Sequence, residues 1–298
     1  MENHGKKYRI LAVDLDGTLL NNEEDISDKN AEAVFRAKEA GTIVVITTGR
    51  SISSAMKFIK RLHSCGPCIT YNGAVIRNGE HTLRELLLEE GVVKELVTGL
   101  KGLGQNPILY TLDDMRFYDE LGDQTENFFN FSRGLEDRII RVKDLSSRRW
   151  RGIIRISIFT DEKKISILEK EISSRYGRIV RTTRTYFPVW DFWIYEILNP
   201  EATKSSGLAY ICNLHGIRRE EVIAVGDNLN DLDMLEWAGL GVAMKNALPD
   251  VIERADYVTS RSNDEDGVAE VIEKFILNPL ERHGKAFQGH RSYPDNTQ

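Results

Sequence analysis

The stretch that decides the fold is Ile10-Leu11-Ala12-Val13-Asp14-Leu15-Asp16-Gly17-Thr18, an apolar run followed directly by two carboxylates and a glycine. A short apolar run that ends at a turn signal is typical of a buried β-strand. A second run, Val222-Ile223-Ala224-Val225, leads in the same way into Gly226-Asp227-Asn228-Leu229-Asn230-Asp231. In an open parallel α/β sheet, ligands bind beyond the carboxyl ends of the strands. The sequence therefore predicts that the acidic residues of both stretches meet at one edge of a sheet.

A cluster of carboxylates at a sheet edge requires a cation to balance it. Oxygen ligands without histidine suit Mg²⁺. A lysine at the same edge, for which Lys204 is the candidate, would in turn require an anion. Carboxylates, Mg²⁺ and a lysine together are typical of a site for phosphoryl groups.

The composition is that of a globular protein with a sizeable core. The chain has 298 residues, of which 41% are hydrophobic and 29% are charged, and this suits one large domain or two medium ones. The net charge of −6 argues against nucleic acid as the main partner. The polar start does not resemble a signal peptide, and no apolar run of roughly 18 residues indicates a membrane span. We therefore expect a cytoplasmic protein without a membrane partner, and the sequence leaves its oligomeric state open.

Strand and helix patterns alternate at both ends of the chain. In the first third, the patterns predict strands at 10–13, 42–48, 68–71 and 74–76, a helix capped by Ser27, and a helix at 54–62. After residue 200 they predict helices at 204–214, 229–238 and 268–275 and strands at 222–225, 240–244 and 257–259. Alternating β and α elements imply a parallel sheet with right-handed crossovers. We therefore expect an α/β fold with a Rossmann-like parallel-sheet core.

The middle of the chain follows a different pattern. Helical stretches at 85–100 and 162–176 are mixed with β-type stretches at 108–112, 116–118, 153–159, 179–183 and 192–196. We expect residues 83–196 to form an inserted α+β cap domain between two core segments, 1–82 and 197–278. At about 110 residues, this insertion is long enough to hold its own core. The polar segment 279–298 is expected to be disordered.

The two carboxylates of Asp14–Thr18 suit covalent phosphoryl transfer. Asp-Gly is also a common turn dipeptide, so these five residues alone could form an ordinary turn. As a catalytic motif, the first carboxylate can attack phosphorus and form an aspartyl phosphate. The second, Asp16, can protonate the leaving oxygen and later take a proton from water. Gly17 lets the backbone turn tightly beside the phosphate.

With its further motifs, the chain resembles the haloacid dehalogenase superfamily of phosphatases. More closely it is similar to the Cof-type subfamily, which carries a large α+β cap (type IIB) between the second and third motifs. The first family motif, Asp-x-Asp-Gly-Thr, matches Asp14–Thr18, and the second, a threonine at a strand end, matches Thr48 in Thr47-Thr48-Gly49-Arg50. The third is a lysine, matched by Lys204, and the fourth, Gly-Asp-x-x-Asn-Asp, matches Gly226–Asp231.

The resemblance implies a role for each matching residue. Asp14 would be the nucleophile and Asp16 the acid/base. The implied Mg²⁺ ligands are Asp14, Asp227, Asp231 and the backbone carbonyl of Asp16. The residues implied to bind the phosphate are Thr48, Gly49, Lys204 and Asn230, and those implied to face the substrate are Arg50, Asn72 and Asn246. Two positions depart from the family pattern, because Ser205 and Lys245 stand where glycine is usual, and we expect the Lys245 side chain to point to solvent.

These inferences predict a Mg²⁺-dependent phosphatase. Its substrate would be a small soluble organic phosphomonoester, such as a sugar phosphate or a similar metabolite, hydrolysed through an aspartyl-phosphate intermediate. One alternative is a phosphomutase that uses the same nucleophile and returns the phosphoryl group to a second hydroxyl. A second alternative is a phospho-receiver signalling module, which also places Asp, Mg²⁺, Thr and Lys at strand ends. The second carboxylate, Asp16, favours turnover, because it provides a means of hydrolysing the intermediate.

Two further groups have less specific patterns. Cys65-Gly66-Pro67-Cys68 copies a redox dithiol, but the residues after it favour a strand, whereas a reactive dithiol is followed by a helix. We interpret it as structural or accidental. Aromatic residues gather where the predicted cap returns to the core: Tyr186, Phe187, Trp190, Phe192, Trp193 and Tyr195. A packed hinge or cap core is the favoured interpretation, and lining of the substrate cleft is the alternative.

Overall fold

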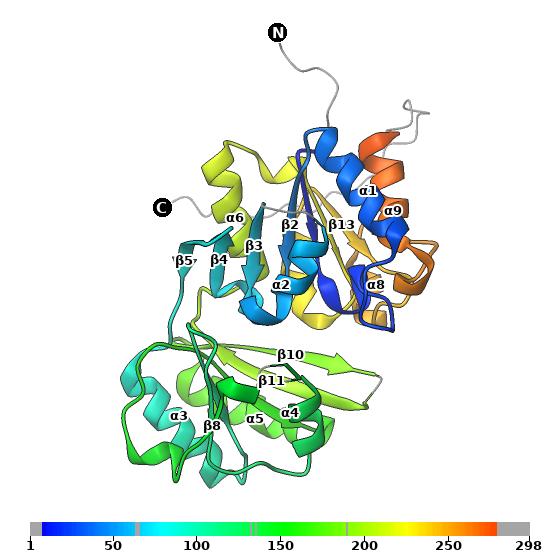
Figure 1. The fold of residues 1–298 in the computed structure, drawn as a ribbon. Coiled ribbons are helices and arrows are strands. Elements are labelled where there is room, and N and C mark those ends of the chain that lie inside the picture. Colours follow the sequence, from blue (N-terminus) through cyan, green and yellow to red (C-terminus); the bar gives the residue numbers. More distant parts are fainter. Residues whose placement is uncertain (1–7, 63–65, 132, 135, 189, 279–298) are drawn as a thin grey trace.

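The computed structural model describes residues 8–62, 66–131, 133–134, 136–188 and 190–278, which form two lobes, each built on its own sheet (Figure 1). The larger sheet has eight strands in the order β14-β13-β12-β1-β2-β3-β4-β5. Its parallel strands are β1 (Ile10–Val13), β2 (Ile43–Thr47), β3 (Pro67–Thr70), β12 (Val222–Gly226), β13 (Leu240–Ala243) and β14 (Tyr257–Val258). The strands β4 (Val75–Asn78) and β5 (His81–Glu85) extend it antiparallel. The predicted α/β fold with a mainly parallel core sheet is confirmed.

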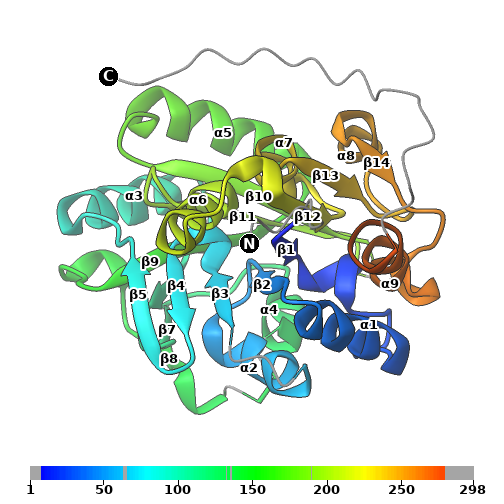
Figure 2. The ribbon, with the colours of Figure 1, turned by 90° about the horizontal axis from the view of Figure 1, so that it is seen from above.

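Helices cover both faces of this sheet (Figure 2). One face carries α1 (Asp28–Glu39), α2 (Ile52–Arg61) and α9 (Gly267–Ile272), and the other carries α6 (Lys204–His215), α7 (Leu232–Trp237) and α8 (Pro249–Arg254). Side chains cap the amino ends of several of them. Ser27 accepts a hydrogen bond from the Asn30 amide at the start of α1, as predicted, and Thr203 caps α6. We call this sheet with its helices the core lobe.

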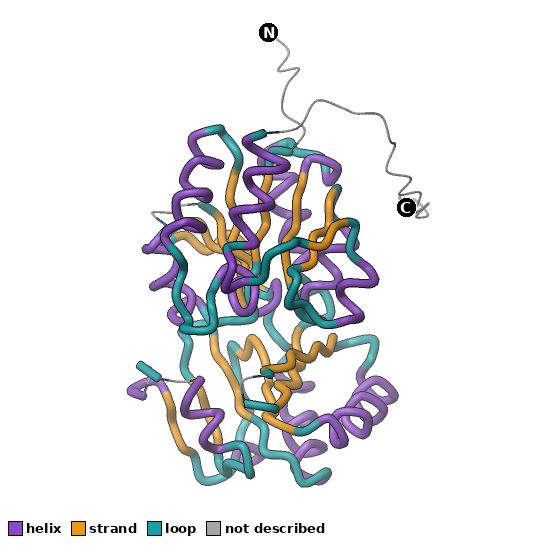
Figure 3. Tube along the Cα trace, turned by 90° about the vertical axis from the view of Figure 1, so that its right-hand side faces the viewer, coloured by secondary structure: helices purple, strands orange, loops and turns teal. Residues whose placement is uncertain are grey.

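The register of the central strands brings the two acidic stretches to one level. Val13 of β1 lies opposite Ile46 of β2 on one side and opposite Val225 of β12 on the other. All three strands run parallel, so the residues that follow them leave the sheet at the same edge. That edge faces the second lobe (Figures 1 and 3).

The second lobe, which we call the cap lobe, is built on a six-stranded sheet in the order β10-β11-β9-β6-β7-β8. Its strands are β6 (Ile108–Thr111), β7 (Arg116–Tyr118), β8 (Ile139–Arg141), β9 (Ile153–Thr160), β10 (Arg181–Phe187) and β11 (Phe192–Leu198). The helices α3 (Glu90–Gly102) and α5 (Glu162–Tyr176) pack their apolar side chains against one sheet face. Phe128 of the short helix α4 (Thr125–Phe131) packs with Tyr110 and Phe159 on the opposite face, which is turned toward the core lobe.

Some elements differ from the sequence-based predictions. The helix expected at 85–100 begins only at Glu90, because Glu85 ends strand β5, which pairs with β4 at the edge of the core sheet. The strand expected at 179–183 is instead Arg181–Phe187, because it pairs along its whole length with β11. Among the α-helices and strands of the described residues, four have no counterpart among the predictions: β5, α4, β8 and α8.

The boundaries between the predicted domains stay a prediction. Strand β5 of the core sheet runs to Glu85 and strand β11 of the cap sheet runs to Leu198, so both cross the expected borders at 82/83 and 196/197. The two lobes have separate apolar clusters, and a third cluster lies between them. The segment predicted to be disordered, 279–298, lies outside the described residues.

The cysteine motif is only partly described. Cys65 lies outside the described residues, whereas Cys68 lies buried in β3, as the strand interpretation requires. Burial raises the pKa of the Cys68 thiol to about 11, which disfavours the reactive thiolate. Among the described helices, none has the length and apolar character that crossing a membrane requires.

Candidate active site

Three carboxylates meet at the edge of the core sheet that faces the cap lobe. Asp14 follows β1, Asp227 follows β12, and Asp231 directly precedes α7. Each contributes one carboxylate oxygen to a group whose members lie within 4.8 Å of one another, and all three residues are buried. The fold thus brings together the two acidic stretches that are more than 200 positions apart in the sequence.

The side chain of Lys204 lies inside this cluster. Lys204 is the first residue of α6 and its side chain is fully buried. Its ammonium donates a hydrogen bond of 2.6 Å to Asp14 Oδ1, another to Asp231, and one of 3.3 Å to the Thr47 carbonyl. One ammonium therefore bridges two carboxylates that would otherwise repel each other.

The three buried carboxylates can carry more negative charge than the single ammonium of Lys204 balances. Burial, with a further contribution from Asp231, raises the pKa of the Asp14 carboxyl to about 8, although Lys204 opposes this shift. Burial and the same neighbouring acids raise the pKa of Asp227 well above its ordinary value. For Lys204, burial lowers the pKa, but Asp14 and Asp231 outweigh burial and raise it. Three carboxylates face one ammonium, so a divalent cation would complete the charge balance.

The loops around the cluster are held by hydrogen bonds to its carboxylates. Thr18 Oγ1 donates to Asp227 Oδ1 at 2.8 Å. The second oxygen of Asp231 accepts from the backbone amides of Asp227 and Asn228, each at 3.1 Å. Gly17 has φ +74°, and a Cβ at this position would lie 2.3 Å from Asp227 Oδ2. A side chain at position 17 therefore has no room beside Asp227.

Asp16 lies at the rim of the same site and binds Arg50. Arg50 Nε donates to Asp16 Oδ2 at 2.8 Å, and its Nη2 donates to Asp16 Oδ1, so the pair is bidentate. Both side chains are partly exposed. Thr48 is fully buried, and its hydroxyl accepts a hydrogen bond of 3.0 Å from the Arg50 amide.

A buried polar network connects the core loops to the cap sheet. Asn230 Nδ2 donates to Asn72 Oδ1 at 3.0 Å, and Asn72 in turn donates to Glu196 of β11 at 2.5 Å. Arg155 of β9 pairs with Glu196 and donates to the Gly49 carbonyl at 2.7 Å. The predicted residues Gly49, Asn72 and Asn230 are therefore held by contacts within the core and by two charged residues of the cap lobe.

Asn246 lies on the other side of the motif that begins at Asp14. Its Nδ2 donates to the Gly17 carbonyl at 2.8 Å, and its side-chain oxygen accepts from the Asn263 amide at 3.0 Å. Lys245 is exposed and pairs with Glu265 at 2.9 Å, which confirms that its side chain points to solvent.

A cavity of about 450 Å³ lies between the two lobes and contains this site. From the core lobe it is lined by Asp14, Asp16, Gly49, Arg50, Asp227, Asn230 and Asn246. From the cap lobe it is lined by Tyr110, Arg116, Arg155, Ser157, Phe159, Thr185, Tyr186, Phe187, Pro188, Trp190, Ile194 and Glu196. The other predicted site residues are buried beside the cavity. Thr48 binds the lining residue Arg50, Asn72 binds Asn230, and Lys204 binds Asp14. Asp231 is buried with them and binds Lys204.

The aromatic group divides between the two interpretations given for it. Tyr186, Phe187 and Trp190 line the cavity. Phe192 and Tyr195 are buried, and Phe192 stacks between neighbouring rings with centroids 5.4 Å from Phe187 and 5.6 Å from Phe159. The favoured interpretation as packing therefore does not hold for these three residues, because the end of β10 and the β10–β11 turn carry their side chains to the cavity.

Comparison with known proteins identifies the family. The sequence model of the haloacid dehalogenase-like hydrolases matches residues 11–272. The chain belongs to this family. Bacillus subtilis YxeH, whose name gives phosphatase as a provisional activity, is 32% identical over 288 residues, covering 91% of this chain and 99% of that protein. The 5-amino-6-(5-phospho-D-ribitylamino)uracil phosphatase YitU of B. subtilis is 29% identical and covers 91% of this chain and 98% of its own.

Solved structures support the same assignment. The structure of the haloacid dehalogenase subclass IIB sugar phosphatase BT4131 has a TM-score of 0.75 and 26% identity, covering 89% of this chain and 98% of that chain. A haloacid dehalogenase-like hydrolase from Bacteroides thetaiotaomicron has a TM-score of 0.72 and 31% identity, covering 90% and 99%. The chain is thus a Cof-type phosphoric monoester hydrolase, and the resemblance found in its motifs is confirmed. The phospho-receiver alternative is not supported.

Sequence reasoning missed two charged residues of this haloacid dehalogenase-like hydrolase, Arg155 and Glu196. A signal was present in the sequence. Each is a single charged residue in an otherwise apolar strand, in Ile153-Ile154-Arg155-Ile156 and in Ile194-Tyr195-Glu196-Ile197. Charged side chains are rarely buried unless they are paired, so two isolated charges of opposite sign in neighbouring strands indicate a buried pair.

Replacement of Gly17 by alanine tests the close approach of this turn to Asp227. We expect Gly17→Ala to abolish most activity, because the new Cβ overlaps the Asp227 carboxylate. Gly79→Ala is the matched control, since Gly79 also has a positive φ (+60°) but a Cβ added there would meet nothing within 4 Å. Both variants should lose about 1 kcal/mol of unfolding free energy from backbone strain, measured by urea denaturation. Equal activity in the two variants would show that Asp227 does not depend on this contact.

Proposed function

We propose that the protein is a Mg²⁺-dependent phosphatase that hydrolyses a small organic phosphomonoester through an aspartyl phosphate on Asp14. The observation that carries the proposal is the buried cluster of Asp14, Asp227, Asp231 and Lys204 beneath the 450 Å³ cavity. The cluster combines a carboxylate nucleophile, an ammonium that can neutralise a phosphoryl oxygen, and an acidic triad suited to a hard cation.

The residues present fit Mg²⁺. Carboxylate oxygens are its preferred protein ligands, and the raised pKa values of Asp14 and Asp227 reflect the excess negative charge that burial leaves there. Asp14, Asp227 and Asp231 would hold the ion, together with the Asp16 carbonyl that the family resemblance implies. The bound ion would neutralise charge on the phosphoryl oxygens and orient the phosphate toward Asp14.

The chain's own groups would then carry out two displacements. An Asp14 oxygen attacks phosphorus, the bond from phosphorus to the ester oxygen breaks, and the leaving oxygen takes a proton from Asp16. Asp16 next removes a proton from water, whose oxygen attacks phosphorus; the bond from phosphorus to the Asp14 oxygen breaks, which releases phosphate and regenerates the Asp14 carboxylate. Since Arg50 binds both oxygens of Asp16 in this structure, the acid role requires that substrate binding draws the two apart. Lys204 compensates charge at Asp14 in both steps.

The cap lobe would select the leaving group. Its sheet presents Arg155, which binds the Gly49 carbonyl, and Ser157 to the cavity, whereas Phe187 and Trp190 line it from the end of β10 and the β10–β11 turn. We infer that a substrate places hydroxyl or other polar groups against the first pair and a flat or apolar group against the second. Sugar phosphates and phosphate esters with a planar ring both fit this arrangement of the cavity. The name of BT4131 gives a sugar phosphatase, and that of YitU gives a phosphatase whose substrate contains a uracil ring.

A phosphomutase would need room for a second phosphorylated position, and product analysis separates it from a phosphatase.

Replacement of the nucleophile is the first test. Asp14→Asn should lower kcat by several orders of magnitude, because an amide oxygen is a poor nucleophile. Hydrolysis of p-nitrophenyl phosphate measures the loss, and the melting temperature shows that the fold persists. Asp250→Asn, an exposed aspartate in the first turn of α8, is the control and should behave as the wild type. Activity above a few per cent in Asp14→Asn would exclude this residue as the nucleophile.

A second test separates metal binding from turnover. Asp227→Asn removes a charge that burial and like-charged neighbours disfavour, so without metal the variant should melt at the same temperature as the wild type or higher. Addition of Mg²⁺ should raise the melting temperature of the wild type, because the ion binds only the folded state, and should leave that of the variant almost unchanged. A chelator should stop hydrolysis. An equal Mg²⁺-induced shift in both proteins would contradict the metal site.

A third test concerns the aromatic end of the cavity. Uridine 5′-monophosphate and ribose 5-phosphate differ mainly in a planar ring. If Trp190 contacts that ring, Trp190→Leu should lower kcat/KM for the nucleotide by about tenfold, which corresponds to the stacking free energy of one base, and should spare ribose 5-phosphate. Trp193→Leu is the matched control, since Trp193 is on the same hairpin but does not line the cavity. Equal losses of kcat/KM on both substrates would show that Trp190 serves packing and does not contact the ring of the substrate.

A further inference from the structure

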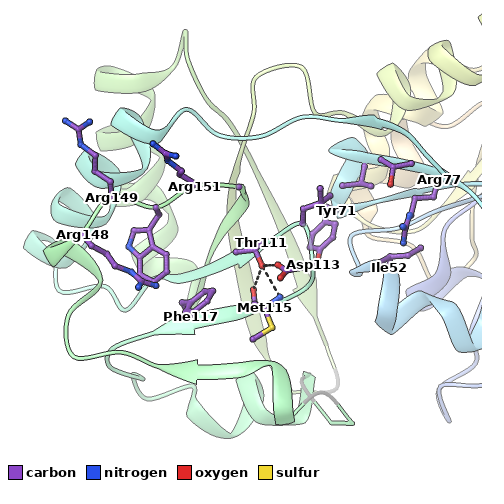
Figure 4. Close-up of a pocket in the computed structure, with 15 residues that line it drawn as sticks. Ile52, Tyr71, Arg77, Thr111, Asp113, Met115, Phe117, Arg148, Arg149 and Arg151 are labelled. Carbon is purple, nitrogen blue, oxygen red and sulfur yellow. Dashed lines mark hydrogen bonds between the residues drawn. The ribbon is translucent and has the colours of Figure 1, made fainter. Parts of the chain in front are cut away.

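The hairpin between β6 and β7 inserts one carboxylate of the cap lobe into the core lobe. Asp114, at the tip of this hairpin, is only 1% exposed. Its Oδ1 accepts a hydrogen bond of 2.6 Å from the Tyr71 hydroxyl, and its Oδ2 accepts from Ser51 at 2.9 Å and also from Ser53. Figure 4 shows the neighbouring cavity, which Thr111 and Asp113 of the hairpin line together with Tyr71 and Ile52 of the core lobe.

The donors to Asp114 adjoin two residues that the family resemblance places at the substrate, Arg50 and Asn72. Ser51 directly follows Arg50 and caps α2, and Tyr71 directly precedes Asn72. The two segments are already joined by backbone bonds, from the Tyr71 amide to the Arg50 carbonyl (3.0 Å) and from the Asn72 amide to the Thr48 carbonyl (3.1 Å). Asp114, from the cap lobe, therefore adds a hydrogen bond to each segment. Together these bonds fix Thr48, Arg50 and Asn72 relative to one another.

Backbone strain is concentrated at this contact. Tyr71, Asn72 and Asp114 all have positive φ, at +50°, +51° and +67°. Such conformations are unfavourable for residues other than glycine and persist where the surroundings impose them. The turn at Tyr71 also packs tightly against Thr203, the residue before Lys204. A Cβ on Gly73 would lie 2.0 Å from the Thr203 carbonyl oxygen. Two strained residues from different lobes thus hold each other through one buried hydrogen bond.

We propose that Asp114 is a positioning residue for the phosphate site, through which docking of the cap lobe orders the Thr48–Ser51 loop and the Tyr71–Asn72 turn. The carboxylate does not touch the reacting atoms. It acts through Ser51 and Tyr71, so the site for the phosphate is complete only while the hairpin is docked. This inference rests on the proposed function for its catalytic consequence, but the ordering of the two segments can be measured without any turnover.

The test compares two adjacent aspartates of one turn. Asp114→Asn keeps a residue type that tolerates positive φ but removes the charge that accepts three hydroxyls. Asp113→Asn is the matched control, because Asp113 is exposed and, among the residues that the structure describes, its side chain binds only Thr111 of the same hairpin. Hydrogen exchange of the amides at 48–54 and 71–72, measured with inorganic phosphate and Mg²⁺ present, should be faster in Asp114→Asn and unchanged in Asp113→Asn. Similar melting temperatures would show that this change is local.

Activity gives an independent measurement. Loss of a hydrogen bond to a charged group corresponds to a change of about ten- to a hundredfold, and kcat/KM and the affinity for inorganic phosphate should both fall within this range in Asp114→Asn. Tyr71→Phe should cause part of the same loss, and the double variant should lose less than the sum, because the two residues share one bond. Tyr71→Phe also serves if Asp114→Asn does not fold.

The outcomes distinguish this proposal from the function it rests on. Unchanged exchange at 48–54 in both Asp114→Asn and Tyr71→Phe would overturn the positioning role, whatever the activity. Faster exchange in a protein whose wild type hydrolyses no phosphate ester would uphold the ordering and refute the phosphatase. Additive losses in the double variant would show that Asp114 and Tyr71 act separately, which also contradicts the proposal.

Discussion

The buried ammonium of Lys204 is the constraint on which the site depends. It binds Asp14 and Asp231, which belong to stretches far apart in the sequence, in a place where all three side chains are buried. Removing one partner from such a group leaves a buried charge without compensation, which costs far more than the loss of a surface pair. The strand order that puts β1 between β2 and β12 is what makes this arrangement possible, since it aligns the residues that follow these strands.

The neighbouring turn shows how tightly the core loops are packed around this cluster. Tyr71 and Asn72 adopt a conformation that is unfavourable for them, with Gly73 pressed against the residue that caps α6. The same helix begins with Lys204. Because the turn contacts both this helix end and the loop after β2, displacement of any one of the three would move the others. The side-chain amide of Asn72 therefore binds Asn230 and Glu196 in an orientation that the turn, the start of α6 and the loop after β2 fix together.

Sequence patterns predict the core lobe better than the cap lobe, for a physical reason. Strands buried on both faces of a parallel sheet are continuous apolar runs that end at polar turns, and Ile10–Val13 and Val222–Val225 have this form. The missed elements β8 and α4 of the cap lobe, like β5 and α8 of the core lobe, are short and lack such patterns. The same holds for the site. Asp14, Asp227 and Asp231 follow recognisable strands, whereas Arg155, Glu196 and Asp114 acquire their surroundings only when the cap sheet faces the core.

Several contacts between the lobes are polar, beside the apolar cluster that also lies between them, and this has a consequence for motion. Hydrogen bonds join Arg155 to the Gly49 carbonyl, Asn72 to Glu196, Asp114 to its hydroxyl donors and Asn228 to the Tyr186 backbone, and water could solvate all of these groups if the lobes separated. Desolvation offsets much of the attraction within such buried pairs, so breaking these contacts by exposing them costs little net free energy. These polar contacts around the cavity suit an enzyme whose cavity must close around a substrate to exclude water and must open again to release phosphate.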